Sequence, residues 1–185
     1  MENMKVNFLI IGGGMVGLSI ANQLKKKYPK KIICIVDKEY SLGNHSSGRN
    51  SGVLHAGIYY PPNTLKAKLC VEGAKRLKEW VIKENLPILN CGKVISPQNL
   101  DLDSQLDILL KRGIDNGAKI RMIDKNEFSK LVPDGRTASG RAIWSPNTNV
   151  VSPKLVISRL FRKLKENGIQ FILNTKILKV DKNKK

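Results

Sequence analysis

Residues 5–37 read KVNFLIIGGGMVGLSIANQLKKKYPKKIICIVD. Residues 5–11 form a short apolar run that ends in three glycines, which is typical of a strand followed by a tight turn. A helix is expected over residues 15–27, because apolar side chains recur there at helical spacing before a Tyr-Pro pair ends the pattern. Residues 32–36 are a continuous apolar run, as in a parallel strand buried on both faces. The stretch therefore predicts a βαβ unit. The apolar side chains that share one face of its helix are Val16, Ile20 and Leu24.

The glycines of this unit follow the GxGxxG spacing of dinucleotide-binding turns, with Gly12, Gly14 and Gly17 in the three positions. Gly12 permits the tight turn, Gly14 lets the backbone approach a pyrophosphate, and Gly17 allows close packing of helix on strand. The free N–H groups at the start of the helix favour phosphate. Asp37 ends the next strand and is placed to accept hydrogen bonds from ribose hydroxyls. The alternative is a glycine-rich turn that holds no ligand.

The segment after Asp37 bears on which dinucleotide is bound. Residues 46–60 read SSGRNSGVLHAGIYY, where a plain NAD domain would continue into another helix. This glycine- and serine-rich stretch, with a single arginine, is placed to wrap the far half of a longer cofactor.

At this point the sequence resembles the FAD-dependent oxidoreductases of the D-amino-acid-oxidase superfamily. Within that superfamily, residues 46–60 and the following LKAKLCVEG of residues 65–73 resemble the L-2-hydroxyglutarate oxidases and dehydrogenases. Cys91-Gly92-Lys93 and a helix that begins at Ser152-Pro153 fit the same pattern. The resemblance covers essentially the whole chain. It implies an α/β fold, with a Rossmann-type FAD-binding domain and the start of an inserted α+β substrate domain.

The resemblance also implies a reaction. FAD accepts a hydride from C2–H of a 2-hydroxy acid, which becomes the 2-oxo acid, and the electrons pass on to oxygen or a membrane acceptor. Asp37 stands where glutamate is common, and either carboxylate can bind ribose. Backbone groups of Ile177 would lie near the adenine. The full set of implied cofactor-binding residues is Gly12, Gly14, Met15, Val16, Gly17, Asp37, Lys38, Ser46, Ser47, Arg49, Asn50, Ser51, Gly52 and Ile177.

His55 is the candidate catalytic residue, because the HAG stretch of this family passes close to the flavin ring. A neutral imidazole there can accept the proton of the substrate hydroxyl, and a charged one can attract a carboxylate. The alternative is a histidine that packs against the flavin or orients a loop. His45 is interpreted as a loop residue, and no metal site is expected.

The remaining elements divide the chain into three expected parts. Residues 1–85 form the first part of the FAD-binding domain, 86–150 the beginning of the substrate domain, and 151–185 the returning helix and strands. Members of the family are roughly twice as long, so the chain resembles their N-terminal portion. Further helices are expected over residues 64–85, 101–116, 125–131 and from 152 to about 166, and strands over residues 93–96, 119–122, 141–144, 171–173 and 177–180.

The composition bears on two other classes of function, nucleic-acid binding and membrane association. The 185 residues carry 33 Lys+Arg against 15 Asp+Glu, a formal charge of +18, which raises nucleic-acid binding as an alternative. Only 8 of the basic residues are arginine and 5% of all residues are aromatic, so base readout and stacking are disfavoured. Peripheral contact with an anionic membrane surface is a further option. No apolar run reaches the ~20 residues of a membrane span. Three widely spaced cysteines favour a reducing cytoplasm.

The resemblance leaves rival functions open. They are another member of the superfamily that oxidises an amino acid or glycerol 3-phosphate, a basic protein that binds nucleic acid or a membrane surface, and an inactive fragment.

Overall fold

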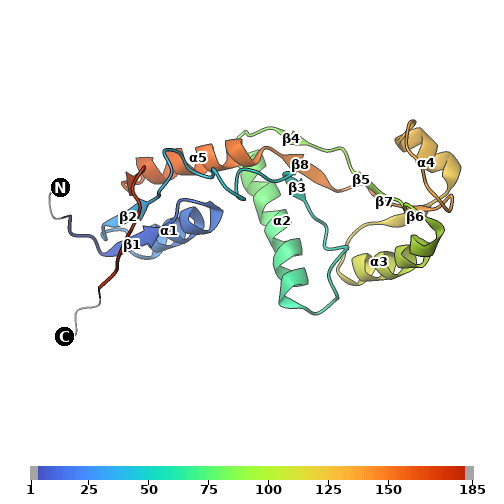
Figure 1. The fold of residues 1–185 in the computed structure, drawn as a ribbon, viewed down its shortest axis with the longest axis horizontal. Helices are drawn as coiled ribbons and strands as arrows, with labels where there is room; N and C mark the ends of the chain where they lie inside the picture. Colours follow the sequence, from blue (N-terminus) through green and yellow to red (C-terminus); the bar gives the residue numbers. More distant parts are fainter. Residues whose placement is uncertain (1–3, 182–185) are drawn as a thin grey trace. The chain divides into compact units, whose positions relative to one another are not determined.

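The computed structural model describes residues 4–181, and the chain folds as two compact units (Figure 1). Unit 1 consists of Met1–Ser51 and Ser152–Lys185, and unit 2 of Gly52–Val151. The sequence prediction placed the first boundary after residue 85, whereas residues 52–85 group with the second unit. The difference arises because the short strand β3 (Val53–Leu54) pairs with β8 (Asn149–Val151) inside unit 2.

Unit 1 contains the predicted βαβ arrangement. Its parallel sheet has the order β1-β2-β9, from β1 (Phe8–Ile11), β2 (Ile33–Val36) and β9 (Gln170–Ile172). Helix α1 (Met15–Lys27) connects β1 to β2, with the bounds expected from the sequence. All four residues of β2 are buried, because this strand lies in the middle of the sheet. The α/β fold class is therefore confirmed.

The buried side of α1 is not the face that carries Val16, Ile20 and Leu24. Helix α1 packs against β2 and α5, and the residues that it buries are Leu18 and Ala21. Val16 is 73% exposed, and Ile20 is exposed as well. The periodicity identified the helix correctly but did not identify its inner face.

Helix α5 (Pro153–Glu166) returns the chain to the sheet of unit 1. Ser152 caps it by accepting a hydrogen bond from the Leu155 N–H, as its Ser-Pro start predicts. The apolar spacing of this helix predicts that Leu155 and Phe161 are buried, but Leu155 is exposed and Phe161 is half-buried, with its ring edge-to-face against Phe171. The residues buried in α5 are Val156, Ile157, Leu160 and Leu164.

The prediction of a strand over residues 177–180 is wrong. After β9, the N–H groups of Asn174 and Thr175 donate to the carbonyl oxygens of Glu39 and Asp37, each at 2.9 Å. Asn174 has a φ of 51°, so the backbone turns at this position. Leu178 is 88% exposed, and no strand in the described part of the chain pairs with this segment. An apolar run without a neighbouring strand has no partner for its backbone hydrogen bonds.

Unit 2 contains two three-stranded antiparallel sheets. One has the order β3-β8-β4, with β4 at Ile88–Leu89, and the other has the order β5-β7-β6. The strands of the second sheet are β5 (Lys93–Ile95), β7 (Ala142–Ser145) and β6 (Arg121–Ile123). The helices are α2 (Leu65–Lys83), the 3-10 turn η1 (Leu100–Leu102), α3 (Asp103–Asp115) and α4 (Lys125–Leu131). A core of Ile123, Phe128 and Ala142 joins α4 to the second sheet.

Helix α2 begins as predicted, because the Thr64 hydroxyl accepts a hydrogen bond from the Ala67 N–H. The apolar spacing of this helix predicts a buried face that includes Leu65, Leu69 and Val81, and that face is only partly buried. Leu65 and Leu69 are exposed, and the residues buried in the helix are Ala67 and Val81. No helix within residues 4–181 combines the length and the apolar character needed to cross a membrane.

The 185-residue chain by itself is expected to self-associate and to hold FAD weakly. Leu9 and Ile11 on β1, and Val16 and Ile20 on α1, expose large apolar side chains, which favours aggregation. Size-exclusion chromatography with light scattering and flavin fluorescence measures both properties. Ile20→Lys should reduce the association, and Lys26→Gln on the same helix is the control. A monodisperse monomer with one FAD per chain would contradict this prediction.

Candidate cofactor site and the His55 cluster

The turn between β1 and α1 has the close geometry that its glycines predict. Gly12 has a φ of +105°, and its N–H donates to the Val36 carbonyl oxygen at 2.8 Å. A Cβ atom at Gly17 would collide with the carbonyl group of Gly12. The first turn of α1 can therefore close onto the glycine turn only because residue 17 has no side chain.

The N-terminus of α1 offers donors to an anion. Gly14 is the N-cap, and Met15 N–H donates to the Ser47 hydroxyl oxygen at 3.0 Å. The next N–H groups, of Val16 and Gly17, have no intrahelical acceptor. The first turn has no acidic residue, so its partial positive charge is not neutralised by the helix itself. Ser47 accepts from Met15 and keeps its own hydroxyl proton for a phosphate oxygen. The site therefore fits a pyrophosphate.

Asp37 follows β2 and lies against the glycine turn. One carboxylate oxygen accepts from the Gly13 N–H at 2.6 Å, and the other accepts from the Glu39 N–H at 2.9 Å. Each oxygen can accept a further hydrogen bond, so a ribose hydroxyl can still bind. The sequence assigned Asp37 to ribose alone, whereas the structure shows that it also holds the glycine turn. Lys38 is exposed and forms an ion pair with Glu39.

The predicted flavin-side segment starts as a compact turn. The Asn50 amide donates to the carbonyl oxygens of Ser46 and Ser47, and the N–H groups of Gly48 and Arg49 donate to the His45 carbonyl oxygen. The His45 ring contacts the Glu39 carboxylate at 2.9 Å. These bonds bring Ser47 to the glycine turn. The cofactor-binding roles predicted from the sequence stay predictions for the whole set of residues, which is Gly12, Gly14, Met15, Val16, Gly17, Asp37, Lys38, Ser46, Ser47, Arg49, Asn50, Ser51, Gly52 and Ile177.

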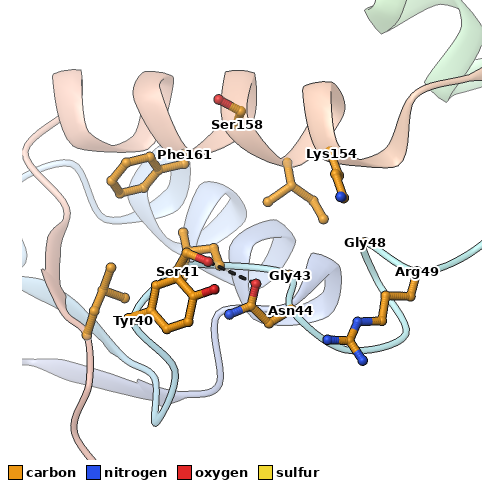
Figure 2. A pocket seen from close by; sticks show the side chains of 12 residues that line it. Tyr40, Ser41, Gly43, Asn44, Gly48, Arg49, Lys154, Ser158 and Phe161 are labelled. Carbon is orange, nitrogen blue, oxygen red and sulfur yellow. Dashed lines mark hydrogen bonds between the residues drawn. The ribbon is translucent and has the colours of Figure 1, made fainter.

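A cavity of about 620 Å³ lies in unit 1 between residues 40–49 and α5. Figure 2 shows Arg49 on one wall and Lys154 on the other, with the Ser41 hydroxyl donating to the Asn44 side-chain oxygen. The cavity includes Gly48 and Arg49 of the predicted cofactor segment, but the glycine turn and Asp37 do not line it. Sequence analysis missed Tyr40, Asn44 and Lys154 as lining residues. The lack of helix or strand periodicity after residue 41 marks Asn44 only as part of a loop, and the helix predicted from residue 152 gives Lys154 no role.

His55 lies in unit 2, in a cavity of about 490 Å³. Lys75 and Lys78 of α2 and Lys119 also line this cavity, and none of the described residues that line it carries a carboxylate. Burial lowers the pKa of His55, and the positive charge of Lys93 lowers it further. The imidazole is therefore neutral at neutral pH, which is the form that can accept a proton.

Tyr59 adjoins His55, and Lys93 from a separate segment contacts Tyr59. The ring of Tyr59 is edge-on to the imidazole, with 6.1 Å between ring centroids. Lys93 donates from Nζ to the Tyr59 hydroxyl oxygen at 2.6 Å. From the sequence alone, a packing role is favoured for Tyr59, and no role is assigned to Lys93. Within residues 4–181, no group of three or more His, Cys, Asp or Glu side chains is arranged to hold a metal ion.

The amino-acid sequence is similar to those of known L-2-hydroxyglutarate dehydrogenases. L-2-hydroxyglutarate dehydrogenase of Caenorhabditis elegans is 38% identical over 180 residues, which are 97% of this chain and 41% of that protein. The bacterial L-2-hydroxyglutarate dehydrogenase of Indibacter alkaliphilus is 37% identical, over 96% of this chain and 44% of its own length. The chain thus spans about 40% of the length of these relatives.

Solved structures and a family model extend the comparison. L-alpha-glycerophosphate oxidase from Mycoplasma pneumoniae, solved with FAD bound, matches with a TM-score of 0.85 and 30% identity, over 94% of this chain and 46% of that one. Glycine oxidase from Bacillus cereus, 17% identical with a TM-score of 0.81 over 97% of this chain and 50% of that one, shares the fold. The model of the FAD dependent oxidoreductases (DAO) matches residues 7–185. With the helix N-terminus, the glycine turn and Asp37 arranged for a dinucleotide, the chain belongs to the DAO family of FAD-dependent oxidoreductases, as the resemblance predicted.

Proposed function

We propose that this chain carries the FAD-binding half of an enzyme that oxidises L-2-hydroxyglutarate, or a close 2-hydroxy acid, to the 2-oxo acid. The observation that carries this proposal is the 38% identity to an L-2-hydroxyglutarate dehydrogenase over 97% of the chain, in a protein whose glycine turn fits a dinucleotide. The relatives are more than twice as long, so the activity belongs to the protein completed by a C-terminal part.

The residues of unit 1 hold the cofactor in this proposal. The N–H groups at the start of α1 and the Ser47 hydroxyl bind the pyrophosphate, and the Asp37 carboxylate binds the ribose. Backbone groups of Ile177 would hold the adenine, and residues 46–52 would hold the flavin side of the cofactor. When bound, FAD supplies a hydride acceptor at N5.

The residues of unit 2 act on the substrate. As the C2–H bond breaks and the hydride leaves, the hydroxyl proton passes to the unprotonated ring nitrogen of His55, so C2 becomes a carbonyl carbon. Lys75, Lys78 and Lys119 make the cavity of His55 positive, which suits a dicarboxylate. The electrons would pass on to oxygen or to a membrane acceptor, and the net charge of +18 favours peripheral contact with an anionic membrane from the cytoplasm.

Glycerol 3-phosphate is the second candidate substrate. It is favoured by the match to L-alpha-glycerophosphate oxidase, which at 30% identity is more similar to this chain than the glycine oxidase is. A phosphate dianion suits a lysine-lined cavity as well as a carboxylate does.

The test joins this chain to the C-terminal part of a related dehydrogenase and examines the purified protein. The expected result is a flavin spectrum, release of FAD on denaturation, and anaerobic bleaching by L-2-hydroxyglutarate. The D-enantiomer is the control for stereochemistry, and glycerol 3-phosphate tests the second candidate. Release of a nicotinamide nucleotide without flavin would refute the cofactor assignment. Faster bleaching by glycerol 3-phosphate than by L-2-hydroxyglutarate would refute the substrate.

A further inference from the structure

Two sequence motifs that lie far apart along the chain meet in unit 2. The HAGIYY stretch supplies His55 and Tyr59, and the CGK stretch supplies Lys93, which is 34 residues beyond Tyr59. The Lys93 ammonium donates to the Tyr59 hydroxyl oxygen at 2.6 Å and lies 4.5 Å from the centroid of the Tyr59 ring. The same ring stands edge-on to His55 at an angle of 78°. Tyr59 therefore contacts both the lysine and the histidine.

Strand pairing fixes the backbone position of Lys93. Lys93 is the first residue of β5 and pairs with Ser145 of β7. The preceding Gly92 has a φ of +67°, and a Cβ atom there would collide with the Trp144 ring. Its N–H donates to the Thr148 carbonyl oxygen at 3.0 Å. The glycine of the CGK stretch thus lets the strand start under Trp144, with Lys93 in a set position.

We propose that Lys93 and Tyr59 are positioning residues for His55: Tyr59, which contacts both side chains, holds the Lys93 ammonium in place, and this fixed positive charge keeps His55 in the neutral form that accepts a proton. The inference rests on the proposed function for its role in turnover. The effect on His55 is a property of the chain itself and is measured without turnover.

The other charged and titratable groups around His55 come from two further places. Lys75 and Lys78 of α2, and Lys119 ahead of β6, line the same cavity. The Cys70 thiol of α2 donates to the His55 carbonyl oxygen at 3.5 Å. Among these groups, Lys93 is the cation that lowers the pKa of His55, after the larger effect of burial. Tyr59 is placed to hold the Lys93 ammonium in position through their hydrogen bond.

The sign of the effect follows from the charge. A cation beside the imidazole disfavours the imidazolium, so removing it must raise the pKa of His55. Burial remains in such a variant, so the pKa rises only part of the way to its ordinary value. In the completed enzyme the acid limb of flavin reduction, where His55 becomes protonated and inactive, moves to higher pH by the same amount.

Histidine NMR provides the test, because the chain has only two histidines. The pH titrations of the His55 and His45 ring signals are compared in the unsubstituted protein, Lys93→Met, Lys93→Arg and Tyr59→Phe. We expect the His55 midpoint to rise in Lys93→Met and in Tyr59→Phe, and to stay in place in Lys93→Arg, where the charge is kept. The His45 midpoint should not move. Lys111→Met is the matched control, since Lys111 lies in the same unit but pairs with Asp115.

Three results would overturn the proposal: a His55 midpoint unchanged in Lys93→Met, an equal rise in Lys111→Met, or a rise in Lys93→Arg as large as in Lys93→Met. If the chain alone associates, the titration is recorded on the chain completed by a C-terminal part, with His55→Gln identifying the signal. If Lys93→Met does not fold, Lys93→Gln takes its place, because it removes the same charge and must also raise the His55 midpoint. Loss of turnover on 2-hydroxy acids with the NMR shifts intact would refute the proposed function and leave this inference standing.

Discussion

Gly14→Val is expected to abolish FAD binding without unfolding unit 1. Gly14 is the N-cap of α1 at φ −75° and ψ 179°, a conformation open to any L-residue. A Cβ atom there would lie 3.0 Å from the Ser47 hydroxyl oxygen, on the side where the pyrophosphate must approach the helix N-terminus. The branched side chain would fill that space and force Ser47 away from Met15. Flavin content after purification of the completed enzyme measures the loss, and circular dichroism measures the fold.

Gly73→Val is the matched control for this substitution. Gly73 lies in α2, where an added Cβ atom has nothing within 4 Å, so the same change of residue meets open space. The control should keep its flavin. Gly17→Val is expected to behave differently from both, because its side chain meets the backbone of Gly12 and lowers the stability of unit 1 itself. A Gly14→Val protein that retains stoichiometric FAD would show that the pyrophosphate does not bind at this turn.

His55→Ala in the completed enzyme should slow flavin reduction by about 10²–10⁴-fold, the usual effect of losing a general base. The FAD content should stay near that of the unsubstituted enzyme, because the predicted cofactor-binding residues do not include His55. Anaerobic stopped-flow measurements, normalised to bound flavin, report the chemical step alone. His45→Ala is the control, since His45 is exposed and contacts Glu39.

A packing role for His55 gives the reverse pattern. Flavin retention would then fall, and molecules that keep their FAD would react at nearly the normal rate. A normalised rate that falls less than about threefold, well below the range for a general base, would exclude His55 as the proton acceptor. The base would then have to come from the C-terminal part of the completed protein.

The nucleotide-binding half of the fold could be predicted because its signals are local. The glycine spacing, the apolar run of β2 and the position of Asp37 each depend on residues close in sequence, and the structure contains the βαβ unit that they indicate. The strands β3, β4 and β8 were missed, because two- or three-residue strands are determined by partners far away in the chain. The segment over residues 177–180 has strand-like composition but no partner in the described part of the chain.

In the candidate site, too, features that depend on residues close in sequence could be predicted, and features that depend on distant contacts could not. The close geometry of the glycine turn could be predicted from the sequence, whereas the roles of its residues toward FAD and of His55 toward the substrate stay predictions. The two backbone hydrogen bonds of Asp37 could not be foreseen, because they depend on how the turn meets the end of β2. The contact between Lys93 and Tyr59 depends on the pairing of β5 with β7, which no local sequence pattern indicates.

The insertion of unit 2 between β2 and α5 has a consequence for the order of folding. The third strand of the parallel sheet, β9, pairs Gln170 with Cys34, so this contact closes a loop of more than a hundred residues. The Val151 N–H donates to the Gly52 carbonyl oxygen at 3.0 Å, which places the entry and exit of unit 2 side by side. If unit 2 folds first, the effective loop shrinks to about forty residues, those of 34–52 and 151–170, and the entropic cost of docking β9 falls by about 1 kcal/mol. Mutations that weaken β3–β8 pairing should therefore slow the assembly of the FAD-binding sheet, although they lie outside it.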